Sequence, residues 1–358
     1  MFDHLSLSLL LLVFAAAATA VWVAGIHLSN TTDVLSARFG LGQALGGLIL
    51  LALVTNLPEL AITVSAALGG HLEVAVGNIL GGIAIQTVVL VVLDVFGLGK
   101  KSSLTYRAAS LVLVLEGVLV VAVLTVAVIG SQLPATLIFA HVTPASLLIF
   151  LLWVVGLWLI GKASKTLPWQ AHGTTPPGGQ AAKRGHAVDK KNDQAKQQQH
   201  STARTMLVFL GCAAVTLVAG VVLERSGDAI AGHIGMSGVL FGSTVLAAAT
   251  SLPEVSTGLT SVKLGDYQLA VSDIFGGNAF LPVLFLVASL ISGQAVLPRA
   301  GKTDIYLTGL GILLTSVYLY GLIFRPQRQI ARMGIDSFLV LVLYALGVLG
   351  LVAISGTH

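Results

Sequence analysis

The pentapeptide TNLPE at residues 55–59 is repeated as TSLPE at residues 250–254, 195 positions later. Each copy puts a proline and a glutamate in the middle of a long apolar run. A lipid-buried helix tolerates these residues poorly, because proline removes a backbone hydrogen bond and an ionised carboxylate is expensive to bury. The two pentapeptides, which we call the first and second motif, are therefore where a function is to be sought.

The motifs belong to a chain that is too apolar for a soluble globular protein. Of its 358 residues, 56% are hydrophobic and only 9% are charged. Apolar runs of about 20 residues, the length that crosses a bilayer, predict an all-α polytopic membrane protein with ten transmembrane helices. The expected helices cover residues 5–27, 41–68, 72–96, 105–129, 143–161, 205–223, 237–262, 267–292, 304–324 and 336–355.

Basic residues are distributed unequally between the two sides of these spans. The polar segment at residues 162–204 is rich in Gln, Lys, Gly and Pro and is predicted to be a flexible linker. On its side of the membrane fall 16 of the 19 Lys and Arg residues. The positive-inside rule therefore predicts a cytoplasmic linker and both termini outside, in a bacterial-type inner membrane. The same rule accounts for the net charge of +4 without nucleic acid.

The sequence also limits the partners. The single cysteine, Cys212, lies in an apolar run, so neither a disulfide framework nor a cysteine metal site is expected. No ATP-binding motif is present, which leaves ion gradients or the membrane potential as the energy source. We expect no enzyme activity, no cofactor and no obligate protein partner. The expected partners are the lipid bilayer and transported cations.

The linker separates two halves, residues 1–161 and 205–358, that contain an internal repeat. Aligned without a gap, residues 55–86 and 250–281 are identical at 11 of 32 positions. Because each half has five predicted spans, an odd number, the second half must enter the membrane from the opposite side. Such inverted five-helix repeats are typical of secondary transporters with a binding site near the midplane. The repeated regions are residues 40–96 and 235–292.

The motifs concentrate oxygen atoms in the middle of the membrane. Each proline frees the carbonyl four residues earlier, and such a break survives in lipid only where it lines protein or a water-filled cavity. In each motif the Thr and the Glu are four residues apart and are predicted to share a helix face. The candidate cation-binding residues are Glu59, Glu254, Thr55, Thr250, Asn56 and Ser251.

This oxygen set selects for hard cations. Carboxylates with carbonyls and hydroxyls bind Ca²⁺, Mg²⁺, Mn²⁺ or Na⁺ in preference to Zn²⁺ or Cu²⁺, and two bidentate glutamates favour Ca²⁺. Glu59 and Glu254 are the predicted metal ligands. The structural alternative is that the prolines only kink their helices and each glutamate pairs with a base. No Lys or Arg lies in the central part of a predicted span, and both halves carry the Glu, so cation binding is favoured.

Together with GNILGG at residues 77–82 and SDIFGGN at residues 272–278, the motifs resemble the two alpha-repeats of the cation/Ca²⁺ exchanger superfamily. This superfamily includes sodium/calcium and proton/calcium exchangers. The resemblance implies a mid-membrane cation site between interrupted helices, with the motif glutamates as principal ligands and backbone oxygens near Ala52 and Ala247 contributing. It also implies that the first and sixth helices slide as a gate for alternating access.

The chain departs from the superfamily at the positions of further ligands. Sodium/calcium exchangers carry a second ligand pair, usually Asn and Asp, where this chain has Gln86 and Leu281. They usually carry Ser where it has Gly82 and Gly277. One expected carboxylate and several hydroxyls are thus missing. A site with two glutamates is more similar to the proton-coupled members.

Other polar residues in the predicted spans are possible secondary participants. Asp273 stands where the first half has Asn78, and would supplement the site, lie at the cytoplasmic entrance of its span, or cap a helix. Glu116 would act in proton coupling or in an interhelical hydrogen bond. Asp94 is expected at a surface or a gate. The secondary candidates are Gln86, Asn78, Asp273, Asn278, Ala52, Ala247 and Glu116.

The sequence therefore predicts a secondary active antiporter. It would exchange Ca²⁺ or a similar divalent cation for H⁺ or Na⁺ by alternating access at the two-glutamate site. Two alternatives remain open: a monovalent Na⁺/H⁺ exchanger on the same scaffold, and a non-transporting membrane protein with a regulatory cation site.

Overall fold

The computed structural model describes residues 4–38, 52–98, 102–164, 201–236 and 238–355. This part of the chain is almost entirely helical, as predicted, and its strands form one hairpin of β1 (Gln329–Ile330) and β2 (Met333–Gly334). Eight helical spans in it are long and apolar enough to cross a membrane. They are α1 (Leu7–Arg38), α5 (Leu72–Val92) with its π-helical continuation η2 (Leu93–Leu98), α7 (Leu111–Ser131), α8 (Pro144–Ala163), α10 (Thr202–Ile234), α14 (Tyr267–Phe280) with η4 (Leu281–Val283) and α15 (Leu284–Ser292), α16 (Lys302–Phe324) and α17 (Ile335–Ser355).

The two spans that contain the motifs are interrupted helices. The first motif joins α3 (Ala52–Thr55) to α4 (Leu57–Gly69), with Asn56 between them. The second joins α12 (Ala247–Thr250) to α13 (Leu252–Lys263), with Ser251 between them. Each proline thus lies in the first turn of a new helix, where a missing N–H costs no hydrogen bond. Ahead of α12 lie α11 (Gly238–Phe241) and the π-helical η3 (Gly242–Leu246).

The predicted ten-helix count stays a prediction, because residues 41–51 of the second expected span lie outside the described residues. The same holds for most of the predicted linker, at 165–200. Helix α8 ends at Ala163 and α10 begins at Thr202. The fourth expected span is shorter at its start than predicted, since the separate helix α6 (Leu104–Ala108) precedes α7.

Two predicted spans were too short. Helix α1 continues to Arg38, beyond the predicted end at 27, and α10 continues to Ile234, beyond the predicted end at 223. The extra turns contain polar residues, so hydropathy marks them as loop. They remain helical because α1 and α10 pack along each other over much of their length, which supplies a tertiary partner that hydropathy does not measure.

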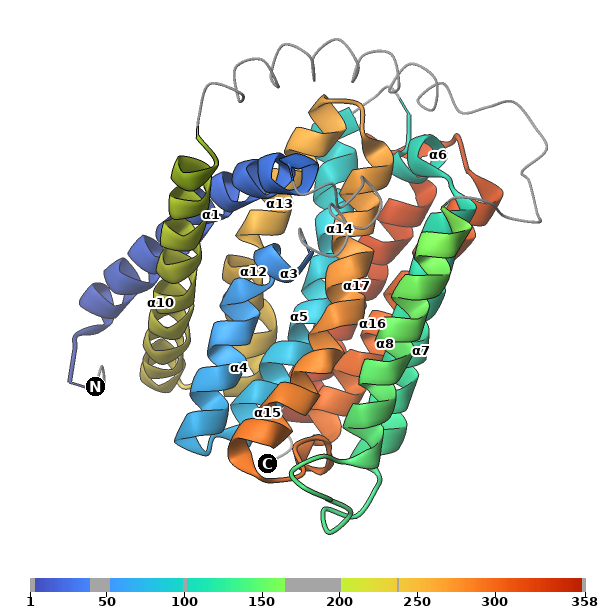
Figure 1. The fold of residues 1–358 in the computed structure, drawn as a ribbon. Coiled ribbons are helices and arrows are strands. Elements are labelled where there is room, and N and C mark those ends of the chain that lie inside the picture. The colour runs from blue at the N-terminus through green and yellow to red at the C-terminus, as the bar shows by residue number, and fades with distance from the viewer. Residues whose placement is uncertain (1–3, 39–51, 99–101, 165–200, 237, 356–358) are drawn as a thin grey trace.

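Figure 1 shows α1 and α10 together on one side of the molecule and α7 and α8 on the opposite side, with α4, α5, α13 and α14 between them. In their most apolar stretches, 72% of the α5 span and 78% of the α14 span are buried, against 22% for α8 and α10. The interrupted helices therefore meet the two most enclosed helices at the centre of the bundle.

Candidate cation site

The two motif glutamates come together at this centre. Glu59 lies in the first turn of α4 and Glu254 in the first turn of α13. Their side chains are 0% and 1% exposed. Oε1 of each carboxylate lies 3.4 Å from Nε2 of Gln86 on α5. The two carboxylates are therefore separated by no more than twice that distance at these oxygens.

Gln86 connects both halves of the site. Its amide nitrogen also donates to Oδ1 of Asn56 at 3.1 Å, so one NH₂ group faces three acceptors. The counterpart of Gln86 in the second half is Leu281, which is buried at the start of η4 and offers no polar atom. A single amide, shared by two carboxylates, thus replaces the expected pair of ligands.

Gln86→Leu is expected to raise the KM for the transported cation by roughly 10–100-fold. The change removes hydrogen bonds to charged groups, each worth about 1.5–3 kcal/mol, where 1.4 kcal/mol corresponds to tenfold. The measurement is the concentration dependence of cation flux in proteoliposomes. Gln132→Leu, the same change at an exposed glutamine that follows α7, is the matched control and should keep the wild-type KM. A wild-type KM in Gln86→Leu would contradict this role.

Several oxygens around Gln86 have no hydrogen-bond partner among the described residues. A buried polar atom without a partner has lost its hydrogen bonds to water and has gained none in the protein, which destabilises the fold. A cation placed among carboxylate and amide oxygens would satisfy these atoms with the ligand type that hard cations prefer. The atoms are Glu59 Oε2, Glu254 Oε2, Gln86 Oε1 and Asn278 Oδ1.

The threonines reach across between the halves. The Thr250 side chain interacts with the Glu59 carboxylate, and the Thr55 side chain interacts with the Glu254 carboxylate. The spacing in sequence predicts the opposite pairing, of Thr and Glu within one motif. It differs because one non-helical residue separates the two side chains; Asn56, for example, has φ −87° and ψ 16°.

The predicted carbonyl ligands are occupied by hydrogen bonds. The carbonyl of Ala52 accepts from Nδ2 of Asn56 at 2.7 Å, and that of Ala247 accepts from Oγ of Ser251 at 2.8 Å. Both carbonyls also accept the backbone N–H of the same residue. In this arrangement Asn56 and Ser251 brace the helix breaks, and their side chains must turn before these carbonyls can bind a cation.

The second half contains a third buried carboxylate close to the site. Asp273 lies inside α14, and its Oδ2 accepts from Oγ1 of Thr257 at 2.6 Å. It also lies near enough to Glu254 for their charges to repel. The alternative of a helix cap is wrong, because Asp266 caps α14 and Asp273 is buried inside that helix; a place near the cytoplasmic entrance of the span stays a prediction.

Thr257 is a residue that the motif analysis missed. Its hydroxyl bridges Asp273 to the Glu254 carbonyl, 3.2 Å away. In the first half, Asn78 makes the equivalent brace directly, because its Nδ2 donates to the Glu59 carbonyl at 3.2 Å. The signal was available in the alignment, since both members of the pair change together: Ile62 and Asn78 in one half, Thr257 and Asp273 in the other.

Asn278 and Gly277 fix the distance between α14 and α5. Nδ2 of Asn278 donates to Oγ1 of Thr87 on α5 at 3.0 Å. A Cβ added at Gly277 would lie 2.7 Å from Nδ2 of Asn56 and 3.6 Å from Oε1 of Gln86. The serine that the superfamily usually has at this position would not fit so close an approach.

Asp94 and Glu116 lie apart from this site. Asp94 is fully buried, so its expected surface position is wrong. Its two oxygens accept the backbone N–H of Leu104 at 2.9 Å and of Gly334 at 2.7 Å, which ties the end of the α5 span to α6 and β2. Glu116 is buried in α7.

The two long helices cross the motifs at glycines. A Cβ added at Gly25 of α1 would lie 2.7 Å from Cβ of Pro253, and one added at Gly220 of α10 would lie 3.1 Å from the carbonyl oxygen of Pro58. These two glycines are themselves 195 positions apart. Helix α1 therefore contacts the helix break of the second half, and α10 contacts that of the first half, in each case through a glycine packed against the motif proline.

Comparison with known proteins gives consistent matches over both halves. The family model described as sodium/calcium exchanger protein matches residues 9–162 and 204–353. The inner membrane protein YrbG of Escherichia coli (strain K12) is 27% identical over 327 residues, which is 88% of this chain and 91% of that protein.

Two solved structures share the fold. The crystal structure of the H⁺/Ca²⁺ exchanger CAX has a TM-score of 0.65 at 12% identity and covers 96% of this chain and 82% of that one. The sodium-calcium exchanger NCX_Mj, soaked with zero Na⁺ and Ca²⁺, has a TM-score of 0.57 at 14% identity, over 97% and 100% of the two chains.

Proposed function

Because the chain belongs to the sodium/calcium exchanger protein family, within the cation/Ca²⁺ exchanger superfamily, we propose that it extrudes Ca²⁺ or a similar divalent cation in exchange for H⁺ or Na⁺. The observation that carries this proposal is the pair of buried glutamates from opposite halves that share the Gln86 amide. Neither carboxylate has a Lys or Arg among its charged neighbours in the described structure. Two buried acids without a base favour a cation as their partner.

The charge at the site supports antiport. Two carboxylates are neutralised by one divalent cation, by two monovalent cations or by protons, and only a neutralised site is favourable in the membrane interior. The site would thus cross between its two states loaded with one ion or the other. The carboxylates, the Gln86 amide turned over to present Oε1, and the threonine hydroxyls together offer the roughly six to eight oxygens that Ca²⁺ prefers.

The proposed transport path follows from the two-half plan. Ten helices in two inverted sets of five would place the site at the midplane, and α1 and α10 would slide to open it to either side. The Lys and Arg distribution orients the protein with the linker in the cytoplasm and both termini outside. Extrusion then proceeds from the linker side in a bacterial-type inner membrane.

One observation favours a second candidate function. Leu281 stands where a further ligand is expected and adds no oxygen. Without the carboxylate expected in that second ligand pair, the site attracts a divalent cation less strongly, which favours a monovalent cation. A monovalent Na⁺/H⁺ exchanger on the same scaffold is therefore the alternative.

Flux in inside-out vesicles distinguishes the two functions. ⁴⁵Ca²⁺ uptake is measured under a proton gradient and, separately, under a sodium gradient, with vesicles lacking the protein as the control. Uptake driven by either gradient supports Ca²⁺ exchange and identifies the coupling ion. Absence of ⁴⁵Ca²⁺ uptake under both, alongside sodium-dependent proton movement, would replace the divalent proposal with the monovalent one.

A further inference from the structure

Glu116 is a buried acid that the cation site does not use. It lies inside α7, is 2% exposed, and neither carboxylate oxygen has a hydrogen-bond partner among the described residues. The polar side chain that interacts with it is Ser272 on α14. The two groups stop short of a hydrogen bond, and the Ser272 hydroxyl is also without a partner in the described structure. An ionisable residue inside a membrane span calls for a functional explanation.

The equivalent helix contact elsewhere in the fold carries its acid at a different position. Two equivalent contacts join the halves: α14 packs against α7, and α5 packs against α16. At the positions equivalent to Glu116 and Ser272, the second interface has Gly311 and Gly77. The second interface has its own buried acid, Asp304 on α16, whose Oδ1 lies 3.7 Å from where a Cβ on Gly77 would be and whose Oδ2 accepts the backbone N–H of Gly301. Asp304 thus caps the start of α16, whereas neither oxygen of Glu116 has a hydrogen-bond partner in the described structure, so a capping role does not account for Glu116.

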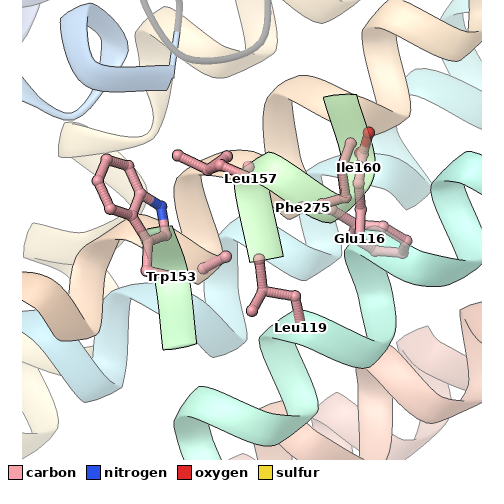
Figure 2. Close-up of a pocket in the computed structure, with 8 residues that line it drawn as sticks. Glu116, Leu119, Trp153, Leu157, Ile160 and Phe275 are labelled. Atoms are coloured by element: carbon pink, nitrogen blue, oxygen red, sulfur yellow. The ribbon is translucent and has the colours of Figure 1, made fainter. Parts of the chain in front are cut away.

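Glu116 lines a small cavity between three helices. Figure 2 shows Glu116 beside Phe275 and Ile160, with Leu119, Leu157 and Trp153 along the rest of the wall. The walls are otherwise apolar, and the cavity has room for about one water molecule. It is too small for an organic ligand and has no second acid for a divalent cation. The ligand that fits this cavity is a proton bound to the Glu116 carboxyl group, with one water molecule beside it.

The cavity is separated from the cation site by the width of α14. Gly276 lines the cavity, whereas its neighbour Gly277 faces Asn56 and Gln86. Likewise Ser272 faces Glu116, whereas Asp273 faces Thr257. A helix is about 10 Å across, so a charge on Glu116 acts on the cation site through one helix.

The cavity lies near one end of the bundle. Glu116 lies one and a half turns after the start of α7 at Leu111, and Ser272 lies equally close to the start of α14 at Tyr267. Both are within roughly 8 Å of that end at the α-helical rise. The carboxyl group therefore lies close to this end of the bundle and on the other side of α14 from the cation site.

We propose that Glu116, together with Ser272, is a proton-binding site outside the cation site, and that its proton is released when the cation binds. This inference rests on the proposed cation exchange and makes H⁺ an ion coupled to it. The linkage has a defined sign. A proton on Glu116 removes a negative charge near the cation site and weakens cation binding, and cation binding favours proton release to the same extent.

The groups around Glu116 leave it as the titrating group of this cavity. The charged residues on the described elements that pack most closely against α7 do not line the cavity, and neither do their tyrosines. These charged residues are Lys162 on α8, Asp273 on α14, Lys302 and Asp304 on α16, and Arg299 in η5 (Leu297–Arg299); the tyrosines are Tyr267, Tyr306, Tyr318 and Tyr320.

Proton release on cation binding tests this site. Ca²⁺ is added to the purified protein in weakly buffered detergent solution with a pH-sensitive dye, and bound Ca²⁺ is measured in parallel. Glu116→Gln is expected to bind Ca²⁺ and to release about one proton fewer per Ca²⁺ than wild type, as linkage requires. Ser272→Ala removes the hydroxyl dipole that favours the ionised carboxylate, so it is expected to release this proton only at higher pH. Thr125→Val, an exposed hydroxyl on the same helix, is the matched control and should equal wild type.

The possible outcomes separate this inference from the proposed function. Unchanged proton release in both Glu116→Gln and Ser272→Ala would overturn the proton site. Loss of Ca²⁺ binding in Glu116→Gln with unchanged release in Ser272→Ala would also overturn it, because the acid would then be structural. Wild type that binds no Ca²⁺ would instead count against the proposed substrate. The titration would then be repeated with Na⁺, and equal proton release by wild type and Glu116→Gln would overturn the proton site.

Discussion

Glu59→Gln is expected to reduce Ca²⁺ transport by on the order of 100-fold or more, and Glu254→Gln to have a similar effect, a loss of about 3 kcal/mol or more. Each change leaves one carboxylate to balance a divalent cation in a buried site, where the missing attraction is poorly replaced by solvent. The two variants should be alike, because the Gln86 amide and the threonines hold the carboxylates as one unit.

The measurement is ⁴⁵Ca²⁺ exchange in proteoliposomes at matched protein content. Glu73→Gln is the matched control: it is an exposed glutamate in the first turn of α5 and should keep wild-type exchange. Full exchange in either Glu59→Gln or Glu254→Gln would remove that residue from the site.

Gly25→Ala is expected to lower the turnover rate roughly 5–150-fold, the range that corresponds to about 1–3 kcal/mol of coupling or overpacking. Its new methyl group would lie 2.7 Å from Cβ of Pro253, so α1 must move away from the helix break. Gly220→Ala is expected to have a smaller effect of the same kind, since its nearest contact is 3.1 Å. Because neither glycine is a ligand, KM should change less than turnover.

Two other glycines of α10 serve as controls. A Cβ added at Gly211 or Gly232 meets nothing within 4 Å. Gly211→Ala and Gly232→Ala should therefore keep wild-type turnover, and alanine should stabilise the helix by about 0.5–1 kcal/mol each. Turnover and thermal stability are measured for all four variants. If Gly25→Ala transports as fast as Gly211→Ala, the contact with Pro253 does not limit the motion of α1.

Much of the fold could be predicted from the repeated motif and the apolar runs. The proline in each motif predicts a break, and the structure has one at Asn56 and at Ser251. The lengths of α1 and α10 could not be predicted in the same way. Their last turns are polar, and they are helical because the two helices support each other. Hydropathy reports transfer to lipid and is insensitive to such packing.

The candidate site was predictable residue by residue only in part. The spacing of four between Thr and Glu predicts a contact within each motif, whereas the interacting side chain comes from the opposite half. In the sequence, Gln86 only stands where a different ligand is expected. Its contact with both carboxylates arises because α5 packs against the two interrupted helices. Such contacts between distant segments carry no local signal.

Some missed residues did leave a trace in the alignment of the halves. The exchange of Asn78 for Asp273 coincides with that of Ile62 for Thr257, which marks a contact. Gly25 and Gly220 also occupy equivalent positions, each after an alanine. Their role as contact points becomes visible only when the partner prolines are placed beside them.

Isothermal titration of Ca²⁺ into the purified protein tests the central claim, that Glu59 and Glu254 jointly form one cation site. Wild type is expected to bind about one Ca²⁺ per chain, as two bidentate carboxylates with neutral oxygens allow. The double variant Glu59→Gln with Glu254→Gln is expected to bind none while unfolding at the same temperature as cation-free wild type. A double variant that binds Ca²⁺ with wild-type stoichiometry and affinity would contradict the claim.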